Sequence, residues 1–147
     1  MVCLGNICRS PLAEGILKDK SKSLNIIVDS AGTAGYHTNN NPDIRSIDIA
    51  KKYNINISNQ RARKFSKDDF NNFDVIYAMD TNNYSDIINM AQNQTEKNKV
   101  RMILNELYPN SFKSVPDPYY GGENGFQKVY DMLNLACDKI IENIEKR

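Results

Sequence analysis

Short apolar runs alternate with longer stretches of helical periodicity along the whole chain, which is typical of parallel strands covered by helices. The apolar runs predict strands at 1–2, 26–28, 75–79 and 100–104. The intervening and following stretches predict helices at 11–22, 43–53, 66–73, 84–91 and 126–144. We therefore expect an α/β fold: three α/β/α layers around a four-stranded parallel sheet whose first strand is truncated at the N-terminus.

Composition narrows the class of protein. At 147 residues and 16.8 kDa, the chain fits one compact domain, residues 1–147. Nineteen Lys and Arg stand against eighteen Asp and Glu, a balance that argues against a nucleic-acid coat or a polybasic membrane anchor. No apolar run approaches a membrane span, and no secretory leader is visible. The three cysteines lack zinc-site or disulfide-framework spacing, so we expect a cytoplasmic protein.

One loop carries most of the chemistry. In the segment VCLGNICRSP, at 2–11, a cysteine and an arginine stand six positions apart before a predicted helix. Backbone N–H groups of such a loop converge on one point, and the helix dipole adds positive potential, so the loop suits a tetrahedral oxyanion. Arg9 offers a planar fork for two phosphate oxygens. The same field stabilises a Cys3 thiolate that can attack phosphorus at neutral pH.

The other residues of this loop serve its conformation. Ser10 is the expected N-cap and Pro11 the first residue of the following helix. Gly5 allows backbone conformations closed to other residues, and Asn6 tolerates a left-handed one. A lone cysteine is usually a small buried hydrophobe, but the full string is much more specific than the C-x5-R spacing.

A phosphate ester also needs an acid to protonate its leaving oxygen. Asp117 stands in the segment DPYYG, in a long loop after the last predicted strand, where an α/β active site would receive it. Pro116 and Pro118 stiffen the backbone around it, and Tyr119 and Tyr120 are placed to wall a slot for a flat ring. An Asp-Pro pair alone is a turn signal, but in a chain that also has the cysteine loop, Asp117 is a candidate acid.

Over nearly its whole length the chain resembles the low-molecular-weight protein tyrosine phosphatases. The matching segments are CLGNICRSP at 3–11, DSAGT at 29–33, NPD at 41–43, ARKFSKDDF at 62–70, FDVIYAMD at 73–80 and DPYYG at 117–121. The first and the last resemble the family's highly specific catalytic signatures. The resemblance implies a hydrolase of phosphotyrosine that needs no metal or organic cofactor.

The resemblance also implies the catalytic roles. Cys3 is the nucleophile, Arg9 binds phosphate and stabilises the transition state, and Asp117 is the general acid. A phosphocysteine forms on Cys3, and water that Asp117 activates as a base then hydrolyses it.

Further residues follow from the same resemblance. Asn6 and Ser10 hold the loop and the thiolate, and Ser30 lies in a second layer behind Asn6. Three tyrosines line the slot for the phosphorylated side chain. The full set expected to bind the substrate is Leu4, Gly5, Asn6, Ile7, Cys8, Ser10, Tyr36, Tyr119 and Tyr120.

The chain departs from the family at three places. The family usually has several apolar residues before the nucleophile, whereas only Met1 and Val2 stand there, so either the native start lies upstream or the strand is a stub. A stub would weaken central pairing. Gln60 stands where the family commonly has histidine, and Asn54 where it commonly has glycine; an asparagine is a tolerable left-handed cap.

Three other functions remain open. Thioredoxin-coupled arsenate reductases share the loop but need a downstream cysteine pair, and only Cys137 lies downstream of it. Protein arginine phosphatases carry threonine where this chain has Ile7 and lack the second tyrosine, Tyr120, so both residues favour phosphotyrosine. An inactive phosphopeptide-binding module is the third, and the joint presence of nucleophile, arginine and acid argues against it.

The expected partners are phosphotyrosine proteins, a bacterial tyrosine kinase among them. We expect no nucleic acid and no membrane as partners, and a monomer. Cys8 either packs beneath the loop or traps an oxidised Cys3 as a disulfide.

Overall fold

A four-stranded parallel sheet with the order β2-β1-β3-β4 forms the centre of the computed structural model, which describes residues 1–119 and 123–146. The strands are β1 (Val2–Cys3), β2 (Ala31–Gly32), β3 (Ile76–Ala78) and β4 (Val100–Met102). Val2 pairs with Ala31 on one side and with Ala78 on the other, so β1 is central despite its two residues. The predicted parallel sheet with a truncated first strand is confirmed.

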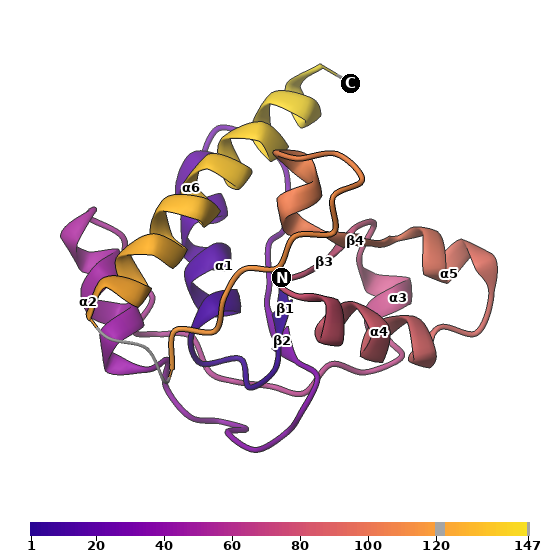
Figure 1. Cartoon of the computed structure of the whole chain (residues 1–147), viewed down its shortest axis with the longest axis horizontal. Helices are drawn as coiled ribbons and strands as arrows, with labels where there is room; N and C mark the ends of the chain where they lie inside the picture. Colours follow the sequence, from indigo (N-terminus) through magenta and orange to yellow (C-terminus); the bar gives the residue numbers. More distant parts are fainter. Residues whose placement is uncertain (120–122, 147) are drawn as a thin grey trace.

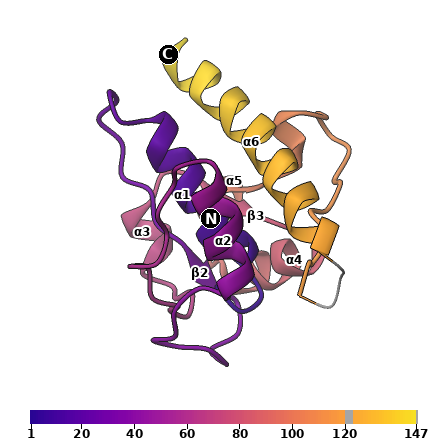
Figure 2. The same cartoon turned by 90° about the vertical axis from the view of Figure 1, so that its left-hand side faces the viewer.

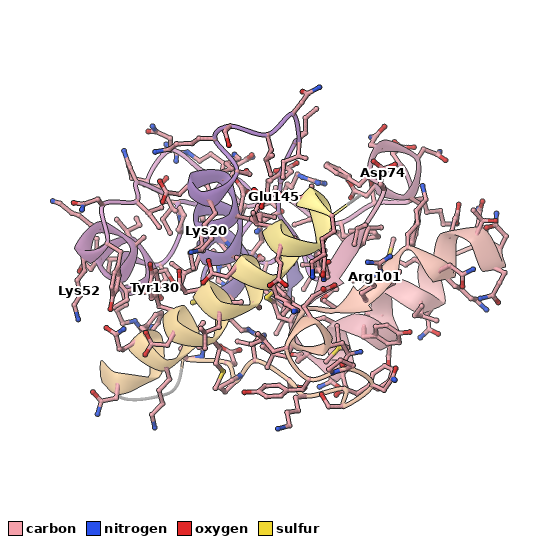
Figure 3. All side chains as sticks on the ribbon, turned by 90° about the horizontal axis from the view of Figure 1, so that it is seen from above. Lys20, Lys52, Asp74, Arg101, Tyr130 and Glu145 are labelled. Atoms are coloured by element: carbon pink, nitrogen blue, oxygen red, sulfur yellow. The ribbon has the colours of Figure 1, made fainter. Side chains whose placement is uncertain are left out.

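Three helices form the layer on one face of the sheet. They are α1 (Arg9–Lys20), α2 (Ile44–Lys52) and α6 (Glu123–Glu145). Figure 1 shows them on one side of the strands, and Figure 2 looks onto α2 with α1 next to it. The rings of Tyr53 and Tyr130 stack with centroids 4.0 Å apart and join the end of α2 to α6. Figure 3 labels Tyr130 where α6 lies against α2.

Shorter helices lie on the other side of the strands (Figure 1). They are α3 (Asp69–Asn72), α4 (Thr81–Met90) and α5 (Gln94–Asn98), and the 3-10 helix η1 (Ile103–Glu106) follows β4. Helix α5 is not among the predicted helices, and Asn93 caps it by accepting from Glu96 N at 2.9 Å. The predicted three layers are confirmed. No helix within the described ranges has the length and hydropathy that crossing a bilayer requires.

The segment 26–28, predicted as a strand, is not part of the sheet. A strand is held by ladder hydrogen bonds to its neighbour, and β1 begins only at Val2, opposite Ala31. The amino group of Met1 donates to the carbonyl of Asp29 at 3.1 Å, where the pairing ends. Segment 26–28 therefore has no neighbouring strand to pair with, and the side chain of Ile27 is 86% exposed.

A cavity of about 480 Å³ lies at this amino-terminal edge of the sheet. Residues 25–31 line one wall and 72–77 another, with Met1 between them. Figure 3 labels two of the lining residues, Asp74 and Arg101, near the C-terminal end of α6. Burial beside this cavity lowers the pKa of the Met1 amino group. The cavity therefore lies where segments 25–31 and 72–77 have only Met1 and Val2 between them.

Side-chain caps start two helices at the opposite, carboxyl edge of the sheet. Asp43 accepts from Arg45 N at 2.9 Å at the start of α2, and Asp80 accepts from Asn83 N at 2.7 Å at the start of α4. Asn54, which follows α2, has φ of +64°, the left-handed conformation expected for it.

Helix α1 begins two residues earlier than predicted, at Arg9. Ser10 is not the N-cap: Cys8 occupies that position and makes no side-chain capping bond. The Ser10 hydroxyl is instead engaged by Asn6, as described below. Pro11 is therefore the third helical residue, which the first turn tolerates because an N–H there has no intrahelical partner.

Candidate active site

Three segments meet at the carboxyl edge of the sheet. The Cys3 loop, residues 3–9, connects β1 to α1, and Asp80 follows β3. The Asp117 segment, residues 116–119, lies between η1 and α6. In Figure 1 this orange stretch passes beside the indigo Cys3 loop. The sheet thus brings together residues that lie more than a hundred positions apart.

Asn6 is the residue that holds the Cys3 loop in shape. It has φ of +57°, as expected, and is 3% exposed. Its Nδ2 donates to Ser10 Oγ at 2.8 Å and to Ser30 Oγ at 2.9 Å, and its Oδ1 accepts from Arg63 N at 3.0 Å. The structure therefore places Ser30 behind Asn6.

Gly5 is needed for a different reason from the one expected. Its φ is not positive. A Cβ at this position would lie 2.9 Å from Cδ2 of His37, a residue of the loop after β2. The sequence did not single out this contact, because a lone histidine in a polar loop carries no signal of packing. A side chain at Gly5 would therefore require the His37 ring to move, whereas the backbone conformation of Gly5 does not itself require glycine.

Cys3 and Cys8 are both buried in the Cys3 loop. The Sγ of Cys3 lies 3.0 Å from Ser10 Oγ. That oxygen accepts from Asn6, so its own proton can go to the sulfur or to the carbonyl of Ala31, 3.5 Å away. Burial raises the pKa of the Cys8 thiol to about 12. The carbonyl of Cys8 accepts from Ser46 Oγ at 3.2 Å, so its backbone is tied to α2.

Arg9 is 3% exposed and joins the three segments. Its Nη1 donates to Asp80 Oδ2 at 2.7 Å and to the carbonyl of Val115 at 3.0 Å. Its Nη2 lies 3.7 Å from Asp117 Oδ2. Asp80 was not predicted as a site residue, although an aspartate directly after a buried strand was the available signal. Asp80 fixes the guanidinium in the site.

The Asp117 segment presents its acid and an aromatic ring to solvent. The side chain of Asp117 is 40% exposed, and its Oδ1 accepts from Tyr119 N at 3.0 Å. Tyr36 and Tyr119 are both exposed, as is Leu4, whereas Ile7 is half-buried. Tyr120, also expected to bind the substrate, lies outside the described residues. Two of the three expected slot tyrosines, Tyr36 and Tyr119, are thus solvent-exposed.

The chain is similar to known proteins over nearly its whole length. The family model described as low molecular weight phosphotyrosine protein phosphatase matches residues 1–147. The chain belongs to this family. This phosphatase is 41% identical over 148 residues to the low molecular weight phosphotyrosine protein phosphatase of Schizosaccharomyces pombe, covering 97% of this chain and 94% of the relative. The resemblance stated from the sequence is confirmed.

Two solved structures resemble the phosphatase closely. A protein tyrosine phosphatase of Entamoeba histolytica superposes with a TM-score of 0.91 at 38% identity, covering 99% of this chain and 94% of the other. A Drosophila arginine phosphatase superposes with a TM-score of 0.88 at 30% identity, covering 97% and 94%. The fold alone therefore does not separate phosphotyrosine from phosphoarginine as substrate.

A buried acid beneath the Cys3 loop of the phosphatase, Glu14, is not among the predicted site residues. Glu14 is 4% exposed; its Oε1 accepts from Ser30 Oγ at 2.6 Å and its Oε2 pairs with Lys18 Nζ at 2.7 Å. Its signal was an acidic residue on the apolar face of α1. Glu14 orients Ser30, which in turn bonds Asn6, so the support of the loop extends into the helix.

Gln60 packs against the same helix. Its Nε2 donates to the carbonyl of Pro11 at 3.0 Å. Its Oε1 is buried, and no residue of the described ranges donates a hydrogen bond to it. The glutamine thus contributes one hydrogen bond at the start of α1 and carries no charge there.

Proposed function

We propose that this phosphatase hydrolyses phosphotyrosine in proteins through a phosphocysteine on Cys3. The observation that carries the proposal is the meeting of Cys3, Arg9 and Asp117 at one edge of the sheet. Arg9 Nη2 lies 3.7 Å from Asp117 Oδ2, while Cys3 begins the loop that Arg9 ends. A nucleophile, an anion-binding arginine and an acid in one place are the parts that cleavage of a phosphate ester needs.

The Cys3 loop is suited to bind the phosphate. It enters α1, a helix of 12 residues, whose positive N-terminal end attracts anions. Arg9 adds a forked donor, and Asp80 holds that fork at 2.7 Å. Because Arg9 is nearly fully buried, its attraction for phosphate is weakly screened by solvent.

The reaction then has two steps. The Cys3 thiolate attacks phosphorus, the bond from phosphorus to the phenolic oxygen breaks, and Asp117 gives its proton to the leaving oxygen. Water next attacks the phosphocysteine, Asp117 takes the proton of that water, and inorganic phosphate leaves with the thiolate regenerated. The Ser10 hydroxyl, 3.0 Å from Sγ, stabilises the thiolate in both steps.

The wider setting of the enzyme belongs to the same proposal. It acts as a monomer of one domain, residues 1–147, in the cytoplasm. Its partners are phosphotyrosine proteins, a bacterial tyrosine kinase being one candidate, rather than nucleic acid or membranes. The near balance of charge, +1 at neutral pH, supports this choice of partner.

Arsenate reduction has less support. That reaction needs a downstream cysteine pair to relay oxidation, whereas Cys137 is the single cysteine downstream of the Cys3 loop, and it is buried. Cys137 is 0% exposed on α6, and its Sγ faces the carbonyl of Ala13. The simplest alternative function is an inactive phosphopeptide-binding module. Hydrolysis of nitrophenyl phosphate by the protein would exclude that alternative.

Substrate preference tests the proposal against its second candidate, an arginine phosphatase, which the Drosophila neighbour makes worth testing. A phenyl ring gains apolar contact with Tyr119 and Ile7 that a short serine cannot reach. We expect kcat/KM on phosphotyrosine peptides to exceed that on phosphoserine peptides by about 100-fold. Phosphoarginine peptides should also be poorer substrates. A preference for phosphoarginine would show that Ile7 does not select phosphotyrosine.

Cys8 is expected to protect the enzyme from oxidation. Peroxide converts the Cys3 thiolate to a sulfenic acid, and Cys8 attacks that sulfur, releasing water and forming a disulfide. The Cys8→Ser variant should keep much of its activity but recover less than about half of the parent's activity when dithiothreitol follows peroxide. Equal recovery in the variant and the parent would leave Cys8 with a packing role only.

A further inference from the structure

Arg45, in the first turn of α2, contacts both halves of the site. Its Nε and Nη2 donate to the two carboxylate oxygens of Asp43 at 3.0 and 2.9 Å. Its Nη1 donates to the carbonyl of Tyr119 at 3.1 Å, across 74 positions of sequence. One guanidinium thus uses three of its donors on two separate segments of the active site.

The Asp43 side of this contact is fixed to the Cys3 loop. The backbone N–H of Asp43 donates to the carbonyl of Ile7 at 2.8 Å. Ser46, the residue after Arg45 in α2, donates from its Oγ to the carbonyl of Cys8. The hydrogen bonds from Arg45 lower the pKa of Asp43, as expected for a carboxylate held in its charged form. The start of α2 is therefore held to the Cys3 loop by two hydrogen bonds to its backbone.

The other side of Arg45 holds the segment that bears the acid. Its guanidinium carbon lies 5.3 Å from the ring centroid of Tyr119 and 4.7 Å from that of Phe126 on α6, within the range of cation–π attraction. Tyr119 N donates to Asp117 Oδ1 at 3.0 Å, so the backbone that Arg45 grips is also the backbone that orients the carboxylate.

We propose that Arg45 is a positioning residue that sets the general acid Asp117 over the nucleophile loop, and the proposal rests on the proposed function above. Arg45 itself need not touch the substrate. A lysine cannot replace it, because the contacts require a planar fork for Asp43, a further N–H for the Tyr119 carbonyl and a flat face for two rings. The 43% exposure of the side chain means that the contribution lies in orientation rather than in overall stability.

The test compares leaving groups, since only help from an acid depends on the basicity of the departing phenol. We expect Arg45→Gln to lower kcat/KM on phenyl phosphate, whose phenol has a pKa of about 10, by about 10-fold. On nitrophenyl phosphate, whose phenol has a pKa of about 7, the loss should stay within about 2-fold. Arg45→Lys should behave like Arg45→Gln. Lys51→Gln, on an exposed part of the same helix, is the matched control and should change neither value.

The ratio of the two substrates separates positioning from simple damage. A partly unfolded variant loses active enzyme equally for both substrates, so equal losses in Arg45→Gln would overturn the proposal. A second measurement adds Arg45→Gln to Asp117→Asn. If Arg45 acts through Asp117, the double variant should lie within about 2-fold of Asp117→Asn on phenyl phosphate.

Failure of this proposal is distinguishable from failure of the proposed function. If Asp117→Asn loses activity selectively on phenyl phosphate while Arg45→Gln does not, Arg45 has no positioning role and the acid assignment stands. If Asp117→Asn itself shows no such selectivity, the acid has been misassigned, and Arg45 cannot act through it.

Discussion

Replacing Cys3 by serine is expected to lower kcat by about 10 000-fold or more, because a serine hydroxyl is a far weaker nucleophile at neutral pH than a stabilised thiolate. Binding of inorganic phosphate should change little. The parts that hold phosphate are the backbone of the loop, the N-terminus of α1 and Arg9, none of which depends on the sulfur. Calorimetric titration with phosphate and initial rates on nitrophenyl phosphate measure the two effects separately.

A matched control identifies the role of the thiol. Cys137 is also buried and free, but it lies on α6 in the core, with its Sγ facing the carbonyl of Ala13 on α1. Cys137→Ala should keep most of the activity at a temperature where the variant is folded. If Cys3→Ser instead retained turnover within about tenfold of the parent, another residue would have to be the nucleophile.

Local sequence predicts those parts of this protein that local interactions determine. The left-handed Asn6 and Asn54 and the apolar faces of the helices each depend on neighbours a few residues away. The strand expected at 26–28 failed because a strand depends on a partner, and β1 supplies only two residues. Segment 26–28 has the apolar composition of a strand, but β1 offers it no backbone groups for ladder hydrogen bonds.

The site divides in the same way. The Cys3 loop is a contiguous string, so its nucleophile and arginine are visible in the sequence. Asp80 contacts Arg9 across 71 positions and Arg45 contacts Tyr119 across 74, and no periodicity encodes such distances. Ser10 illustrates a conflict: its sequence context suits an N-cap, but the bond from Asn6 draws its hydroxyl into the loop.

Asp117→Asn is expected to divide substrates by their leaving groups. An asparagine keeps the size of the side chain but has no proton to give, so the phenolate must leave unprotonated. Loss of kcat/KM should reach about 1000-fold for phenyl phosphate and about 10-fold for nitrophenyl phosphate. A series of aryl phosphates with phenols between these extremes should show a steeper dependence of log kcat/KM on phenol pKa than the parent enzyme.

The use of kcat/KM matters because this quantity reports the steps up to departure of the phenol. The second step, hydrolysis of the phosphocysteine, is common to all substrates, and losing the base there lowers kcat equally for each. Asp86→Asn, on the exposed face of α4, is the charge-matched control and should leave the slope unchanged. Equal losses of kcat/KM across the series in Asp117→Asn would mean that another group protonates the leaving oxygen.

Asp80 is poorly placed to do so, because its carboxylate already accepts a hydrogen bond of 2.7 Å from Arg9 and another from the N–H of Asn83. The side chain of Asp117 is 40% exposed and lies 3.7 Å from the same guanidinium, which leaves it free to meet both the departing phenol and the incoming water.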